Sequence, residues 1–336
     1  MTRYGAMYGP DVTFLGINPC TIDEPATYQN ADVVIMGAPF DGGASYRSGA
    51  RLGPGAIRTA DYLPQDATRP HLALRADGLK DLKVLDAGDV EMFSGDAETS
   101  CRNLEEAVTQ VAKNGAIPII LGGDHTVTWP DVTGIANVHG FGKVAVIHFD
   151  AHADTGDITF GSLIGHGHPM RQLIQSGAVK GNRFWQIGLR GYWPDEDVLK
   201  WMSEQEMRSY EMSEIEARGF NTVIDEVIAE SLKDCVGFFL SVDIDVVDPS
   251  SAPGTGTPEP GGITSRQLLD AVRKLVAKLP LLGMDVVEVA PAYDHSDITA
   301  VLANRVVLEA LSSLAAKKKY PEDPMKFNSR PLLEGR

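Results

Sequence analysis

The sequence predicts a single-domain α/β fold in three layers, α/β/α, with a mostly parallel central sheet. Short β-branched runs alternate with stretches of helical periodicity along most of the chain. Helices between successive strands form crossover connections, which favour parallel pairing and a sheet covered on both faces. No Ser- or Gly-rich linker and no repeat of fixed period divides the 336 residues, so one domain is expected.

Seven runs have the composition of buried strands, because they are short, apolar and rich in β-branched residues. Two helices can also be placed: one begins near Ser100 and stops at the Asn-Gly pair 114–115, and one begins near Ser265 and stops before Pro280. The predicted strands lie at residues 32–35, 83–85, 117–121, 144–149, 183–187, 237–242 and 284–287.

The predicted domain, residues 31–316, is flanked by an N-terminal extension, residues 1–30, and a C-terminal tail, residues 317–336. The tail carries three consecutive lysines followed by three prolines. This composition predicts a solvated or loosely docked segment, with contact to a neighbouring subunit as the alternative.

Composition restricts the classes of partner. The formal net charge is -16, which opposes binding to nucleic acid and to anionic membranes and would favour a cationic small molecule, although solubility alone also explains it. We find no apolar run of about 20 residues and no export signal, so we expect a cytoplasmic protein that does not span a membrane. Cys20, Cys101 and Cys235 are too few for a disulfide framework and are expected to be reduced.

Three strand ends carry clustered polar residues. The strand at 117–121 is followed by GGDH, which presents His125; the strand at 144–149 by DAHAD; and the strand at 237–242 by DID. Because ligands of α/β sheets bind beyond the carboxyl ends of strands, these positions carry the most functional information. Each motif alone fits a turn or a helix cap, but three of them in one chain favour a shared site.

Side chains alternate along extended backbone, so Asp150, His152 and Asp154 share one side, as do Asp243 and Asp245. Four carboxylates in one place repel each other by about 4 kcal/mol per close pair unless cations intervene. Two divalent ions balance them and leave the imidazoles neutral. Oxygen and nitrogen ligands without sulfur suit Mn²⁺, with Ni²⁺, Co²⁺, Fe²⁺ and Zn²⁺ left open. His148 lies within its strand and is expected to be a core histidine.

Together these motifs resemble the signatures of the ureohydrolase superfamily of arginases and agmatinases, and the agmatinase-like branch in particular. The resemblance extends from about residue 37 to 311 and includes FDGGASYR at 40–47, GPGAIR at 53–58 and APGTGTPEPGG at 252–262. It implies an arginase-like fold, two Mn²⁺ per subunit and a homotrimer or homohexamer. It implies that one ion is bound by His125, Asp150, Asp154 and Asp243, and the other by His152, Asp150, Asp243 and Asp245, with Asp150 and Asp243 bridging.

The resemblance also implies roles around the metals. His166 matches the loop histidine that shuttles protons and would protonate the leaving amine. Glu288 matches the carboxylate that holds the substrate guanidinium, and Thr257 matches a residue lining that pocket. His168 stands where agmatinases commonly have a small residue, so this wall of the substrate site differs.

The expected reaction is hydrolysis of a guanidino group to urea and an amine, with agmatine as the leading substrate. The alternatives are 4-guanidinobutyrate, 3-guanidinopropionate, guanidine or an alkylguanidine, a formiminoglutamase-like reaction that releases formamide, and a non-catalytic subunit of a mixed oligomer. An acid-ended substrate predicts a basic residue such as Arg47 or Arg171 at the mouth of the site, whereas an amine-ended one predicts carboxylates there.

Overall fold

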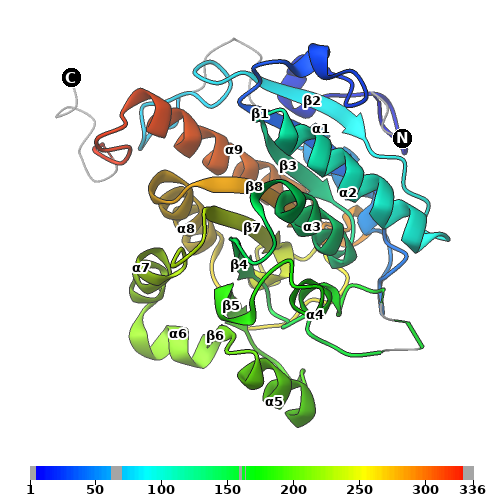
Figure 1. Ribbon diagram of the computed structural model, residues 1–336, viewed down its shortest axis with the longest axis vertical. Coiled ribbons are helices and arrows are strands. Elements are labelled where there is room, and N and C mark those ends of the chain that lie inside the picture. The colour runs from blue at the N-terminus through cyan, green and yellow to red at the C-terminus, as the bar shows by residue number, and fades with distance from the viewer. Residues whose placement is uncertain (1–4, 62–69, 159–160, 163, 328–336) are drawn as a thin grey trace.

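The protein is described by a computed structural model, which covers residues 5–61, 70–158, 161–162 and 164–327. Its centre is an eight-stranded sheet in the order β2-β1-β3-β8-β7-β4-β5-β6, in which every pair of neighbouring strands is parallel (Figure 1). The strands are β1 (Val33–Ala38), β2 (Val84–Asp89), β3 (Ile117–Gly122), β4 (Val144–Phe149), β5 (Phe184–Leu189), β6 (Arg208–Glu211), β7 (Gly237–Asp243) and β8 (Leu281–Val287).

Helices cover both faces of the sheet. In Figure 1, α2, α3 and α4 lie on one side of the sheet and α6 to α9 on the other. Alternate residues of β1 separate accordingly: Val33 and Ile35 belong to one apolar cluster and Val34 and Met36 to the other. The helices are α1 (Gly53–Thr59), α2 (Ala97–Lys113), α3 (Thr128–His139), α4 (Pro169–Gln175), α5 (Glu196–Glu204), α6 (Met212–Arg218), α7 (Phe220–Glu230), α8 (Ser265–Lys278) and α9 (Ile298–Lys319).

This architecture confirms the predicted single-domain, three-layer α/β fold. Each of the seven predicted strands overlaps an observed strand, but β6 was not expected. The reason is its sequence: β6 has four residues, of which only Tyr210 is buried, so it lacks the apolar run of the inner strands. An edge position, with β5 as its one neighbour, allows such a short polar strand.

The two predicted helices are both present. The first, α2, begins at Ala97, three residues before the expected Ser100, because the Asp96 side chain accepts a hydrogen bond from the Thr99 N–H and caps the helix there. The second, α8, begins at Ser265 as expected. Thr264 and Gln267 form a reciprocal capping box in front of it.

The two flanking segments of the predicted domain contact its body where they are described. Phe14 is fully buried, and its N–H donates to Asp86 of β2, so part of the N-terminal extension packs beside the edge of the sheet. At the other end, α9 continues to Lys319, and the Lys317 amino group donates to the carbonyl of Leu279. The first three residues of the predicted tail therefore form the end of α9.

Helix α9 is long and apolar enough to cross a membrane by length and composition, with a mean hydropathy of 1.4. No uninterrupted apolar run marks this helix in the sequence, because Asn304, Arg305 and Glu309 lie within it. In the structure 72% of the most apolar 18-residue segment of α9 is buried, and the helix packs against α1 and α8. The fold therefore accounts for its apolar character as that of a core helix.

Candidate metal centre and active site

The predicted ligands follow three inner strands, β3, β4 and β7, at their carboxyl ends. The turn after β3 requires glycine: a Cβ on Gly123 would lie 1.8 Å from the carbonyl oxygen of Phe40. The same carbonyl accepts a hydrogen bond from Asp124 N–H at 2.8 Å. The Gly-Gly pair thus lets the chain pass close to Phe40 and turn His125 toward the centre.

The first group of potential ligands surrounds the ring nitrogen Nδ1 of His125. This nitrogen lies 3.0 Å from Asp150 Oδ2, 2.9 Å from Asp154 Oδ2 and 3.1 Å from Asp243 Oδ2. All four residues are buried, and their ligand atoms lie close enough together to hold one metal ion.

The second group shares Asp150 with the first. His152 Nδ1 lies 3.1 Å from Asp245 Oδ2 and 3.5 Å from Asp150 Oδ1, and these three residues could hold another ion. Asp150 therefore presents one oxygen to each group, as a bridging carboxylate must. Asp243 belongs to the first group, and its contribution to the second stays a prediction.

Backbone hydrogen bonds fix these carboxylates. Asp150 Oδ1 accepts from His152 N–H at 2.6 Å, and Asp243 Oδ1 accepts from Asp245 N–H at 2.9 Å. Each aspartate therefore caps its own turn with Oδ1 and turns Oδ2 toward His125. The turn-cap and ligand interpretations are therefore compatible: Asp243 uses Oδ1 for the cap and Oδ2 toward His125, whereas Asp150 Oδ1 both caps its turn and faces His152.

The electrostatics of the cluster are those of a site that attracts cations. Burial raises the pKa of Asp243, and the neighbouring Asp245 and Asp150 raise it further. Burial alone would lower the pKa of His152, but Asp245 and Asp150 outweigh it and raise that pKa to about 12. Burial alone would lower the pKa of His125 as well, but the three facing carboxylates outweigh it and raise that pKa. Divalent ions would supply the positive charge that these carboxylates require.

His166 and Glu288 form a pair beside the predicted metal ligands. His166 Nδ1 lies 3.0 Å from Glu288 Oε1, and its Nε2 lies 2.7 Å from Ser45 Oγ. Glu288 Oε1 also accepts the backbone N–H of His125 at 2.9 Å. Burial lowers the pKa of His166, but Glu288 and nearby carboxylates outweigh this and raise it to about 9. The pKa of Glu288 is lowered, because the His166 bond overcomes the effect of burial.

Two residues of the site have left-handed backbone conformations. Asp154 has φ of 50° and Glu288 has φ of 65°, although neither is glycine. Such conformations cost about 1 to 3 kcal/mol and persist only where the surrounding structure imposes them. Here each of them places a carboxylate at the site.

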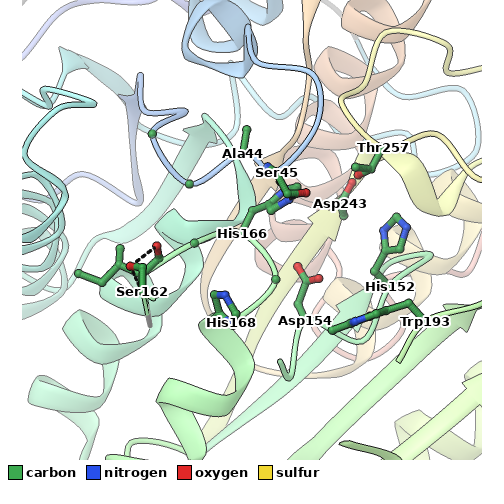
Figure 2. A pocket seen from close by; sticks show the side chains of 15 residues that line it. Ala44, Ser45, His152, Asp154, Ser162, His166, His168, Trp193, Asp243 and Thr257 are labelled. Carbon is green, nitrogen blue, oxygen red and sulfur yellow. Dashed lines mark hydrogen bonds between the residues drawn. The ribbon is translucent and has the colours of Figure 1, made fainter. Parts of the chain in front are cut away.

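The cluster opens into a cavity of about 350 Å³ (Figure 2). Figure 2 shows His152, Asp154, His166 and His168 on the same cavity, with Trp193 beside them. The wall also includes Ala44, Ser45, Ile164, Asp243 and Thr257. Glu288 is buried behind His166 and is not among the described lining residues.

His168 occupies a space that two glycines leave open. A Cβ on Gly156 would lie 3.0 Å from His168 Nδ1, and a Cβ on Gly165 would lie 3.1 Å from its Cδ2. His168 is 5% exposed, and its Nδ1 has no hydrogen-bond partner within the described part of the chain. Thr257, on the same cavity, has its hydroxyl 3.4 Å from Asp245 Oδ2. Both residues line the cavity, and their substrate-binding roles stay predictions.

The two arginines considered for an acid-ended substrate do not line this cavity. Arg171 donates its Nε–H to Thr155 O at 2.8 Å and stacks on Trp201. Arg47 lies between the rings of Tyr46 and Tyr293, at 5.1 and 5.2 Å. Both guanidinium groups have protein partners outside the described lining.

Sequence reasoning missed several residues of the site. Ser45 and Trp193 line the cavity, and Asp124 accepts the N–H groups of Gly43 and Thr126. Trp193 comes from a loop with no motif to mark it, whereas Ser45 lies in the FDGGASYR stretch that carries part of the resemblance. His148 is buried as expected, but it also contacts Asp150 at 2.8 Å. Its position two residues before a ligand, on the same side of the strand, was the available signal.

Comparisons with known proteins agree with this geometry. The model of the arginase family matches residues 31–312. The chain is 38% identical over 288 residues to proclavaminate amidinohydrolase of Streptomyces clavuligerus, covering 84% of this chain and 88% of that protein. It is 36% identical over 290 residues to mitochondrial agmatinase of Gallus gallus, with 86% and 83% covered. It is 35% identical over 297 residues to guanidinobutyrase of Pseudomonas aeruginosa, with 87% and 89% covered.

The fold agrees as well. The solved structure of the Streptomyces clavuligerus proclavaminate amidino hydrolase superposes with a TM-score of 0.82 at 34% sequence identity, and the match covers 92% of this chain and 98% of that chain. The family match spans the strands that carry all three ligand motifs. The chain therefore belongs to the arginase family.

Proposed function

We propose that this arginase-family hydrolase cleaves agmatine to urea and 1,4-diaminobutane with two Mn²⁺ ions. The observation that carries the proposal is the convergence of six predicted ligands at the ends of β3, β4 and β7, beside the His166 and Glu288 pair. Agmatinase is also the name of one relative reported above. Location in the cytoplasm and assembly as a homotrimer or homohexamer are part of the proposal.

The donor set fits such ions. Among the described residues, buried His125 Nδ1 has no hydrogen-bond partner, and it faces three carboxylate oxygens within 3.1 Å. Oxygen and imidazole donors without thiolates suit Mn²⁺, and also admit Ni²⁺ or Co²⁺. When bound, paired ions supply Lewis acidity and make water a nucleophile near neutral pH.

The residues of the chain would then act on the substrate. Glu288 is an anionic carboxylate in a buried setting, which suits the binding and orientation of a planar guanidinium. His166 holds a proton on the cavity wall and would deliver it to the leaving amine. Ser45, in contact with His166 Nε2, would hold the ring in place for that transfer.

The cavity favours a cationic tail over an acidic one. Its described lining includes the carboxylates Asp154 and Asp243 but no lysine or arginine. With Asp154 and Asp243 engaged by the bound ions, a guanidino acid would find no lysine or arginine in this described lining to pair with its terminal carboxylate. The indole face of Trp193, in contrast, can attract an ammonium group. Agmatine therefore ranks above 4-guanidinobutyrate and 3-guanidinopropionate.

The test is release of urea from a panel of guanidino compounds after loading the protein with Mn²⁺, Ni²⁺ or Co²⁺. We expect agmatine to be the best substrate and Asp243→Ala to abolish turnover, whereas Asp225→Ala, an exposed aspartate of α7, should retain it. Formamide released from a formimino substrate would reassign the reaction. No turnover of any compound by metal-loaded protein would favour a non-catalytic subunit and overturn the proposal.

A further inference from the structure

A row of polar residues crosses the sheet directly beneath the metal centre. Cross-strand neighbours in register from β8 to β6 are Asp285, Ser241, His148, Gln186 and Ser209. The first four are fully buried. On the other side of β8 the same row continues with Ile120 and Met36, so the polar part is confined to the half of the sheet between β8 and β6.

One arm of this row leads to Asp150. The Ser209 hydroxyl donates to Gln186 Oε1 at 3.0 Å. Gln186 Nε2 lies 2.7 Å from the carbonyl oxygen of Ala153 and 3.1 Å from His148 Nδ1. Because a carbonyl only accepts, the group facing it is the amide NH₂, which also donates to His148 Nδ1. The proton of His148 is therefore on Nε2, which donates to Asp150 Oδ2 at 2.8 Å.

The other arm leads to His125. Its Nε2 lies 3.0 Å from Ser241 Oγ, while its Nδ1 faces the carboxylates of the centre. Thr128 Oγ1 lies 3.4 Å from Ser241 Oγ and donates to Asp285 Oδ2 at 2.7 Å. If Nδ1 of His125 binds a metal ion, the ring proton is on Nε2 and is donated to Ser241 Oγ. The hydroxyls of Ser241 and Thr128 then connect His125 to the Asp285 carboxylate.

We propose that this row is the positioning layer of the first metal site, with Gln186 and Ser241 as its key residues. Gln186 fixes the tautomer of His148 and through it the Oδ2 atom of Asp150, and Ser241 fixes the tautomer of His125. Buried partners of this kind orient metal ligands and strengthen their binding. The inference rests on the proposed metal centre but adds residues that contact neither metal nor substrate.

The row also distinguishes the two sites. The arm through Ser241 ends on Nε2 of His125, which belongs to the first group alone, and the arm through His148 ends on Asp150 Oδ2, the oxygen that faces the first group. The His152 ring belongs to the second group, has a side chain 23% exposed, and has no contact with the row among the described hydrogen bonds. Removing the hydrogen bonds of this row should therefore weaken metal binding at the first group much more than at the second.

The experiment titrates Mn²⁺ into metal-free full-length protein by calorimetry, with free Mn²⁺ counted by electron paramagnetic resonance. Gln186→Glu keeps the shape of the side chain but replaces the amide donor with an oxygen against Ala153 O and His148 Nδ1, so His148 is no longer held in the tautomer that donates to Asp150. Ser241→Ala removes the acceptor of His125. Each variant should weaken one of the two binding steps about 10- to 100-fold and leave the other nearly unchanged.

Tyr210→Phe is the matched control. Tyr210 is buried and follows Ser209 in β6, but its hydroxyl donates to Glu226 at 2.9 Å and does not join the row. Loss of this hydroxyl should leave both Mn²⁺-binding steps unchanged. Ser209→Ala tests the far end of the row should Gln186→Glu fail to fold. Unchanged Mn²⁺ affinities in all row variants, or equal weakening of both steps, would overturn the inference. Wild-type protein that binds no Mn²⁺ would overturn the proposed function itself.

Discussion

Asp243, one of the predicted metal ligands, uses its two carboxylate oxygens for different purposes. Asp243 caps its turn through Oδ1, which accepts the Asp245 N–H, and faces His125 through Oδ2. The residue is thus part of a local turn and of a long-range cluster at the same time. Substitutions of Asp243 can separate the contribution of the turn cap to stability from the contribution of the carboxylate charge to metal binding.

We predict that Asp243→Asn folds with nearly wild-type stability but loses Mn²⁺. The amide oxygen can still accept from Asp245 N–H, whereas the charge that holds a cation is gone. Asp243→Ala should lose the metal and also about 1 kcal/mol of stability, because the cap is lost as well. Urea denaturation and metal analysis of both variants measure the two effects. Full metal occupancy in Asp243→Asn would contradict the ligand assignment.

The backbone of Glu288 gives a second prediction at this scale. Its φ of 65° is costly for any residue with a Cβ and free of strain for glycine. Glu288→Gly should therefore be more stable than Glu288→Ala by about 1 kcal/mol, while both lose activity together with the carboxylate. Because both lose the same hydrogen bonds, their difference in free energy of unfolding isolates the backbone effect. A less stable glycine variant would show that the conformation is not strained.

His166 sets the expected pH dependence of activity. Its pKa is raised to about 9, so the protonated ring is present below that pH and is lost as pH rises through it. If His166 donates the proton to the leaving amine, kcat should fall above about pH 9. His166→Asn should lower kcat by about 10² to 10⁴ and remove this limb of the profile.

The matched control for that profile is His139→Asn, at the end of α3, which should keep both kcat and the alkaline limb. The profile is measured as urea release under saturating substrate. An unchanged alkaline limb in the His166 variant would assign the proton donor elsewhere.

At the scale of elements, local signals fix where helices begin, as α8 shows. Thr264 accepts the N–H of Gln267, and the Gln267 side chain accepts the N–H of Thr264. Thr264→Ala should lower the free energy of unfolding by about 1 kcal/mol, measured by urea denaturation. Ser265→Ala, one residue further on and without a capping bond, is the control. Equal losses in both variants would contradict the capping assignment.

Elements differ in how well their sequences predict them. Inner strands such as β4 are buried on both faces, so their apolar runs identify them from sequence. The edge strand β6 carries Arg208, Ser209 and Glu211, and it pairs only because β5 presents its edge to it. The same loss of local signal applies to Trp193, which reaches the cavity from a loop.

At the scale of the whole molecule, metal binding and folding should be coupled. The centre joins loops that follow β3, β4 and β7, so an ion bound there connects three parts of the sheet. At about 100 times its Kd, Mn²⁺ should stabilise the fold by about 2.7 kcal/mol and raise the melting temperature by several degrees. Ca²⁺, which prefers ligands that are all oxygen, should have a smaller effect. Equal or absent shifts in calorimetry would contradict this coupling.

The sequence by itself determined the alternation of strands and helices and the kinds of ligand that follow three of the strands. Both are local properties, because they depend on side-chain periodicity and on spacings of two residues. Only the tertiary structure decided which oxygen of Asp150 faces His125, and that Ser241, His148 and Gln186 stand in one row. Those facts depend on strand order and register, which are set by packing between segments far apart in the chain.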